Sequence, residues 1–211
     1  MATQPSPTND AGQPAPGRRS PLVTWIGLAV IAAGLLMVLA LRPFFISEPD
    51  GTDHHAVGTS VTGIQLEPLV GMGTPLRSAE LEGSVVLVDL WGPWCPPCRR
   101  ELPEIAKLAG KYRRSGDFRL LAVAVPYQES ERETLAADTQ RFLDAASLEI
   151  PVYADPDRKC RLAAQRAGIY TGSFPTTWVM DRHGVVRGVW KGYLPGTVRN
   201  IERLLDRLIA E

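Results

Sequence analysis

The sequence predicts an α/β domain with a central mixed β-sheet flanked by helices, preceded by a single N-terminal transmembrane helix. Three observations support this prediction. Apolar runs alternate with amphipathic stretches of helical period across residues 63–211, which is typical of α/β proteins. The last two apolar runs are joined by a tight turn, which indicates that part of the sheet is antiparallel. Residues 22–41 are uncharged and apolar, and about twenty such residues cross a hydrocarbon layer as a helix.

The segment of residues 22–41 is predicted to be an uncleaved membrane anchor. It shows no polar face, unlike a buried helix of a soluble domain. A cleaved signal peptide is the alternative, although the segment exceeds the usual core of about 7–15 residues. Arg18 and Arg19 precede the span and only Arg42 follows it. This asymmetry favours a cytoplasmic N-terminus and an exported C-terminal domain.

The segments on either side of the predicted span and the charge of the chain indicate the domain boundaries and the partners to expect. Residues 1–21 are rich in Pro, Gly, Ser, Thr and Ala, which predicts a disordered tail. Residues 42–62 are polar and contain Gly, which predicts a linker before a folded domain over residues 63–211. The chain has 23 Lys and Arg against 23 Asp and Glu, so no nucleic-acid partner is indicated. The pair His54-His55 has no third ligand nearby, so no metal site is expected there.

The first half of the domain is predicted to contain two strands around one helix. Residues 85–91 and 118–125 are apolar runs, interrupted in the first by Asp89, and such runs predict strands buried on both faces. Residues 96–114 carry apolar side chains at helical spacing. Pro103 lies inside this predicted helix and is expected to kink it.

The second half is expected to alternate helices with shorter strands. Apolar periodicity and turn residues set the expected boundaries. In chain order the elements are a helix over 131–147, a strand over 151–153, a helix over 156–167, strands over 176–181 and 185–191, and a final helix through Val198, Ile201, Leu204, Leu205 and Leu208.

Two cysteines separated by two prolines are the main candidates for chemistry. Cys95 and Cys98 lie between a predicted strand and a predicted helix, so both sulfurs are expected near a helix N-terminus, which stabilises a thiolate. Because a thiolate attacks disulfides, the motif predicts thiol–disulfide exchange. A structural bridge or half of a zinc site is the alternative, but zinc needs two further ligands, and the only other cysteine is Cys160. Pro96 and Pro97 add no positive charge, which favours a comparatively reducing pair.

Two carboxyl groups near the cysteines are candidate proton carriers. Asp89 lies within an apolar strand, where burying an ionised carboxylate costs several kcal/mol, so its pKa should rise or it should find a partner. It is a candidate proton acceptor for Cys98, unless the strand alternates and turns it toward water. Glu101 lies one helical turn beyond Cys98 on the same face, and either moves protons there or is solvated.

Four further residues have two readings each. Pro175 opens a strand, which suits either a cis turn that leaves backbone groups free for an extended substrate or an ordinary trans proline. Trp91 and Trp94 either shield the disulfide and shape a groove or simply pack in the core. Cys160 lies in a predicted helix, where a small buried hydrophobic role is favoured over a reactive thiol.

A family resemblance rests on two strings. LVDLWGPWCPPCRRELPEI, followed by the distant SFPTTWVMDRHGVVRGVWKG, resembles the thioredoxin fold, specifically the membrane-anchored TlpA/ResA-like thiol–disulfide oxidoreductases of bacteria. The resemblance covers about residues 63–211 and implies a thioredoxin-like fold. It also implies that Cys95 is the solvent-exposed attacking thiol and that Cys98 is the buried resolving thiol.

The resemblance implies further roles by position. Asp89 matches the buried acid of thioredoxins, Glu101 matches a functional glutamate of ResA-like proteins, and Pro175 matches the cis-proline beside the active disulfide. The residues expected to form the substrate groove are Trp94, Pro96, Pro97, Phe174 and Pro175.

The approach to Pro175 departs from the family pattern. The family commonly has a compact Gly-x-x-Gly-x-Pro sequence, whereas residues 168–175 are longer and place the bulky Phe174 before the proline. Thr176 stands where the cytochrome c maturation branch often has an acidic residue. The identity of the substrate is therefore not carried over from the family.

Together these expectations describe a reductase of protein disulfides, anchored in the bacterial inner membrane with its catalytic domain in the periplasm. The redox-active disulfide is Cys95–Cys98, and no metal or organic cofactor is needed. Expected partners are protein thiols and disulfides, with apocytochrome c or another assembly factor as candidates, and a membrane electron donor. One alternative is a disulfide oxidant of the same fold. Another is a copper-binding or metal-delivery protein, although no histidine lies in the active segment.

Overall fold

The computed structural model describes residues 21–45, 50–71 and 73–211. The chain divides into two units, of which the first contains helix α1, Pro21–Phe45, and the second contains the remaining described residues. The side chains described within α1 are those of residues 25–40, and all are exposed. Within the part of the chain that the structure describes, no helix combines the length and hydropathy needed to cross a membrane. The predicted tail, apart from residue 21, lies outside the described residues.

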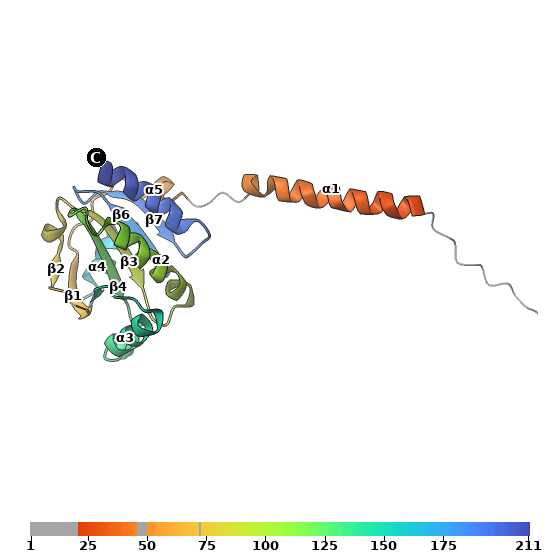
Figure 1. The fold of residues 1–211 in the computed structure, drawn as a ribbon. Coiled ribbons are helices and arrows are strands. Elements are labelled where there is room, and N and C mark those ends of the chain that lie inside the picture. The colour runs from red at the N-terminus through yellow and green to blue at the C-terminus, as the bar shows by residue number, and fades with distance from the viewer. Residues whose placement is uncertain (1–20, 46–49, 72) are drawn as a thin grey trace, which may run out of the picture. The chain divides into compact units, whose positions relative to one another are not determined.

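The second unit is built on a seven-stranded mixed sheet with the order β2-β1-β5-β4-β3-β6-β7 (Figure 1). The central strand β3 pairs in parallel with β4 and antiparallel with β6, so the predicted mixed sheet is confirmed. The strands are β1 Gln65–Val70, β2 Leu76–Arg77, β3 Val85–Trp91, β4 Phe118–Ala124, β5 Val152–Ala154, β6 Thr176–Met180 and β7 Val186–Lys191.

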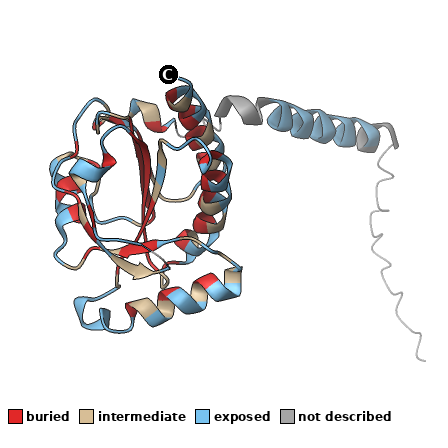
Figure 2. Ribbon diagram, turned by 60° about the vertical axis from the view of Figure 1, so that its left-hand side comes forward, coloured by how far each residue is buried: buried red, intermediate tan, exposed pale blue. Residues whose placement is uncertain are grey.

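Helices cover both faces of this sheet. They are α2 Pro96–Tyr112, α3 Leu135–Ala146, α4 Lys159–Arg166 and α5 Thr197–Ala210, with short 3₁₀ helices η1 Gly51–Asp53, η2 Ser78–Leu81 and η3 Glu129–Glu131. Alternate β3 side chains pack on opposite sides, because successive residues of a strand point to opposite faces. Val86 and Val88 share a core with α4, whereas Val85 and Leu87 share one with α2 and α5. Figure 2 shows the buried strands and the buried side of the C-terminal helix.

The structure differs from the predicted boundaries at two helices. The helix expected from residue 131 begins at Leu135, because η3 and a turn occupy the preceding residues. The helix expected from residue 156 begins at Lys159. Here the Asp155 carboxylate accepts hydrogen bonds from the backbone N–H groups of Cys160 and Arg161, which satisfies donors that a helix N-terminus leaves unpaired.

Strands β1 and β2 were not expected from the sequence. β1 contains one buried residue, Leu66, together with intermediate and exposed ones. Its register against β5 shifts between Pro68 and Val70. A strand of this kind lacks both a continuous apolar run and a clean alternation, the two patterns that identify strands in sequence.

The predicted linker over residues 42–62 is partly incorporated into the folded domain. Ala56 and Val61 are only 1% and 5% exposed and belong to the core that includes β3. Gly51 is buried against Trp190 of β7. The packed domain therefore begins N-terminal to residue 63, where the sequence predicted its start. The buried residues of this segment are small and separated by polar ones, so they form no apolar pattern in the sequence.

The different surroundings of two glycines predict opposite effects on stability when each is replaced by alanine. A Cβ at Gly51 would lie 2.4 Å from Trp190 Cε2, so Gly51→Ala should lower the free energy of unfolding by about 1–3 kcal/mol. A Cβ at Gly110 in α2 would meet nothing within 4 Å, so Gly110→Ala should raise it by about 0.5–1 kcal/mol. Denaturant unfolding of both variants checks this prediction, and equal effects would contradict the close packing at Gly51.

Candidate active site

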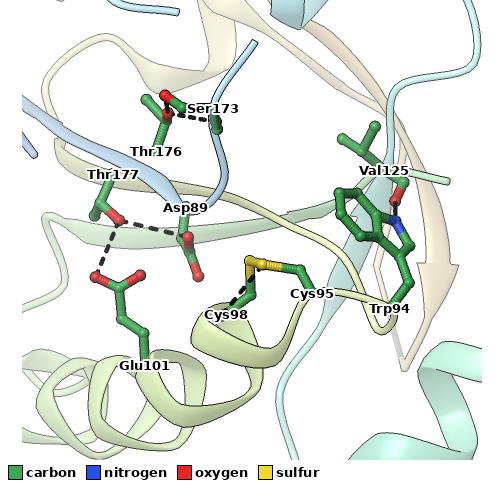
Figure 3. Close-up of a disulfide and its surroundings, with 9 residues drawn as sticks. All are labelled: Asp89, Trp94, Cys95, Cys98, Glu101, Val125, Ser173, Thr176 and Thr177. Atoms are coloured by element: carbon green, nitrogen blue, oxygen red, sulfur yellow. Dashed lines mark hydrogen bonds between the residues drawn. A yellow bond between two sulfur atoms is a disulfide. The ribbon is translucent and has the colours of Figure 1, made fainter. Parts of the chain in front are cut away.

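The two cysteines of the CxxC motif form a disulfide where β3 leads into α2 (Figure 3). Cys95 is the N-cap of α2, and its Sγ accepts a hydrogen bond of 3.3 Å from the backbone N–H of Cys98. Pro96 and Pro97 occupy the first helical positions, where a missing N–H removes no helical hydrogen bond. The expectation that both sulfurs lie at a helix N-terminus is confirmed.

The exposure of the two cysteines differs from the expected pattern. Cys98 is 0% exposed, as the resemblance implies, but Cys95 is only 3% exposed and is not broadly open to solvent. Cys95 instead lines a groove of about 590 Å³ beside Trp94 and Phe174. Cys95 therefore meets the surface of the domain at this groove.

Two carboxyl groups meet beneath the disulfide-bearing helix. Asp89 of β3 and Glu101 of α2 are both 0% exposed, so the alternatives that placed either side chain in water are wrong. The Thr177 hydroxyl of β6 lies 3.5 Å from Asp89 Oδ1 and 3.5 Å from Glu101 Oε1 (Figure 3). Asp89 Oδ2 and Glu101 Oε2 have no hydrogen-bond partner among the described residues. Sequence reasoning missed Thr177, because only the sheet pairing places it opposite Asp89.

This arrangement favours the protonated forms. Burial raises the pKa of Asp89, against an opposing hydrogen bond from Thr177. Burial also raises the pKa of Glu101, and the charge of Asp89 raises it further. A hydroxyl donates only one hydrogen, so a carboxyl that is not its acceptor must donate to it to form a second hydrogen bond. The two carboxyls are therefore most stable when they hold at least one proton between them. One of them, Glu101, lies on the helix that also carries Cys98.

The position of Thr177 gives a testable consequence. A hydrogen bond donated by the Thr177 hydroxyl lowers the pKa of the carboxyl that accepts it, so Thr177→Val should move the deprotonation of that carboxyl to higher pH. Carboxyl ¹³C NMR titration of the oxidised protein measures this shift. The neighbouring Thr176→Val is a matched control, because the Thr176 hydroxyl bonds to the Ser173 carbonyl instead. If neither carboxyl deprotonates at higher pH in Thr177→Val, the hydrogen bond donated by Thr177 is contradicted.

Aromatic side chains form the walls of the groove. The Phe174–Pro175 peptide bond is cis, so the trans alternative is wrong. Trp94 makes edge contacts with Tyr127 and Phe174, and Phe174 makes one with Tyr170. The indole N–H of Trp94 donates to the Val125 carbonyl at 2.8 Å, which fixes the ring.

The remaining candidate residues lie either in the groove or in the core. Pro96 and Pro97 line the groove with Trp94. Trp91 is 0% exposed in the core cluster that includes both cysteines of the motif. Cys160 is 0% exposed among apolar neighbours, and burial raises the pKa of its thiol, which agrees with a packing role.

Sequence reasoning missed part of the groove. Tyr127 and Tyr170 lie on loops, and Arg158 and Arg161 lie at the start of α4, yet all four line the groove beside Cys95. Of these four residues, only Tyr170 could have been connected with the groove from the sequence, because it belongs to the unusual loop before Pro175. The others reach the site only because the sheet order brings β3, β4 and β5 together.

The mixed sheet, the helices on both of its faces and the disulfide at the N-terminus of α2 define a thioredoxin-like thiol–disulfide oxidoreductase. Membership of a particular family follows from sequence. The chain belongs to the AhpC/TSA family, whose sequence profile matches residues 57–189.

Individual relatives agree with this assignment. Thiol-disulfide oxidoreductase ResA of Halalkalibacterium halodurans is 32% identical over 73% of this chain and 78% of the relative. The ResA protein of Geobacillus kaustophilus is 27% identical over 86% of this chain and 95% of the relative. A crystal structure described as a putative thiol:disulfide interchange protein DsbE from Chlorobium tepidum has a TM-score of 0.55 at 24% identity. That match covers 72% of this chain and 98% of the solved one, and it shows the shared fold.

Proposed function

We propose that this protein reduces disulfide bonds in other proteins through Cys95 and Cys98. The observation that carries the proposal is that the Cys95–Cys98 disulfide lies at a helix N-terminus, and Cys95 lines an aromatic groove. A helix N-terminus stabilises a thiolate at the reduced site. The groove provides room for the polypeptide around a substrate disulfide.

The proposed reaction proceeds in two exchanges. The Cys95 thiolate attacks one sulfur of the substrate disulfide, forms a mixed disulfide with it and releases the other sulfur as a thiolate. The Cys98 thiol then loses its proton and attacks Cys95 Sγ, which releases the second substrate thiolate and forms the Cys95–Cys98 disulfide. Two electrons pass to the substrate, and each released thiolate takes up a proton.

The buried carboxyls are proposed to manage the proton of Cys98. Asp89 accepts it when Cys98 becomes the attacking thiolate, and Glu101 and Thr177 position and share the proton afterwards. This role is supported by the complete burial of both carboxyls and by their common contact with Thr177. A buried ionised carboxylate is costly, so a group that begins ionised gains stability on taking the proton.

The setting of the reaction is part of the proposal. Residues 22–41 are proposed to anchor the protein in the bacterial inner membrane, with its N-terminus cytoplasmic and the redox domain in the periplasm. The uncharged, apolar sequence of the segment supports the anchor. There a membrane electron donor re-reduces the cysteine pair, and apocytochrome c or another assembly factor is a candidate substrate. Alkaline extraction of membranes tests the anchor, and release of the full chain into the soluble fraction would contradict it.

The reductase activity is tested with the full chain and a protein disulfide. The protein is reduced chemically, freed of reductant and mixed with oxidised insulin. Thiols on both partners are then counted by alkylation and mass spectrometry. We expect insulin to gain two thiols for each Cys95–Cys98 disulfide formed. Recovery of reduced enzyme beside fully oxidised insulin would contradict the proposal.

A further inference from the structure

The groove beside Cys95 combines apolar and charged walls. The rings of Tyr127, Trp94, Phe174 and Tyr170, which line the groove, form a continuous series of edge contacts. Tyr127 is 63% exposed, although a large aromatic side chain gains by burial. The groove is also lined by the charged residues Glu129, Arg158 and Arg161. The walls therefore offer contacts to a segment that has both apolar and charged side chains.

Two of the charged groups are already held by partners. Arg161 donates from Nε to Asp155 Oδ2 at 3.1 Å, and its Nη2 lies 3.6 Å from Glu129 Oε1. Glu129 also pairs through Oε2 with Arg132 at 2.6 Å. Both oxygens of Glu129 thus face an arginine. These pairs leave little unbalanced charge on Glu129 and Arg161 themselves.

Arg158 differs from its neighbours. Its side chain is exposed, and it forms no ion pair within 4.0 Å with any acidic group that the structure describes. The nearby carboxylates of Glu129 and Asp155 are engaged by Arg132 and Arg161. The guanidinium of Arg158 therefore offers several N–H donors to whatever enters the groove.

We propose that the groove selects extended polypeptide segments in which an acidic side chain and an apolar or aromatic one lie close to the disulfide-bonded cysteine. The aromatic series buries the apolar side chain, and Arg158 binds the carboxylate. A guanidinium binds a carboxylate through paired hydrogen bonds. This inference rests on the proposed reductase function and names the substrate class of the same site.

The test uses the reduced full chain and symmetric disulfides of short peptides. Each peptide has one cysteine with an aromatic neighbour, and Glu, Gln or Lys is placed in turn at positions within about three residues, roughly 10 Å of extended chain. At the best position we expect the second-order rate constant for single-turnover reduction of the Glu peptide to exceed that for the Gln peptide about threefold to fivefold, the range of an exposed ion pair. The Lys peptide should be slowest, and added salt should reduce the differences.

Two variants assign the preference to its residue. In Arg158→Gln the ratio of Glu to Gln rates should fall to about one. In Arg166→Gln, which removes an exposed arginine of the same helix that does not line the groove, the ratio should persist. Tyr127→Ala should lower the single-turnover rate constant for peptides with an aromatic neighbour more than for those with Ala in its place. Oxidised glutathione, which has carboxylates but no apolar neighbour, should react more slowly than the Glu peptide.

The outcomes separate this inference from the proposed function. If every peptide is reduced at the same rate, or if the Glu preference survives in Arg158→Gln, the selectivity proposal is wrong while the reductase function stands. Faster reduction of glutathione than of all the peptides would likewise exclude a polypeptide preference. If no disulfide is reduced by the native chain, the proposed function itself fails.

Discussion

Replacing Cys95 by serine is expected to lower the rate of protein-disulfide reduction at least about a thousandfold, because a hydroxyl is a far weaker nucleophile than a thiolate at neutral pH. Cys95 is the cysteine of the motif that lines the groove, and Cys98 is completely buried behind it. Cys98→Ser should therefore have a different effect. It should still react once through Cys95 and then accumulate as a mixed disulfide with the substrate. Non-reducing electrophoresis and mass spectrometry distinguish the two variants.

Cys160 provides the matched control for this prediction. It is completely buried in the core on the other face of the sheet and does not line the groove. Cys160→Ala should leave the rate of disulfide reduction within about twofold of the native value and form no trapped complex. Accumulation of a mixed disulfide in Cys95→Ser instead of in Cys98→Ser would reverse the roles assigned to the two sulfurs.

Asp89→Asn is expected to slow the resolution of the mixed disulfide about a hundredfold near neutral pH, because the amide cannot accept the proton of Cys98. Glu101→Gln should have a smaller effect. The double variant should cost less than the sum of the two single effects, because the carboxyls share a proton through Thr177. Rapid-quench measurement of mixed-disulfide decay isolates this step. Asp144→Asn, at an exposed carboxylate of α3, is the control and should change nothing.

Asp89→Asn should also make the protein more stable. Burial raises the pKa of Asp89 in the folded protein, so the folded state keeps a proton that the unfolded chain releases near pH 4. The native protein therefore loses stability as the pH rises from about 4 toward and beyond neutrality, while an amide does not titrate. Asp89→Asn should match the native protein near pH 4 and exceed it by a margin that grows up to pH 8, on the order of a few kcal/mol. Thermal unfolding of oxidised full-length protein across this range measures the difference. A gap that is constant with pH would contradict a raised pKa.

The central sheet and its helices could be predicted because their sequence patterns are strong. The uninterrupted apolar runs of β3 and β4 and the helical spacing in α2 and α5 each allow one interpretation. β1 and the segment that carries Gly51 and Ala56 could not be predicted, since their burial depends on small or scattered residues that fit between other elements. Such contacts are set by tertiary packing and leave no local period.

The active-site residues likewise divide into those that the sequence pattern predicts and those that it does not. The chemistry of Cys95 and Cys98 follows from their spacing, and the unusual position of Asp89 in an apolar strand already indicates a special role. Thr177 and Arg158 have no comparable signal. Threonine is ordinary in a strand and arginine is ordinary in a polar loop, so their importance arises only from the register of β6 against β3 and from the start of α4 beside the groove.

The reduction potential of the Cys95–Cys98 pair tests the central claim most directly. The full chain is equilibrated with thioredoxin or glutathione couples of known potential, and the fraction of the disulfide is measured by alkylation. Two prolines between the cysteines and a buried pair of protonatable carboxyls offer little positive charge to a thiolate, which favours a reducing pair. We predict a potential closer to that of thioredoxin, about −270 mV, than to that of the oxidant DsbA, about −120 mV. A value near −120 mV would contradict the account and identify a disulfide oxidant.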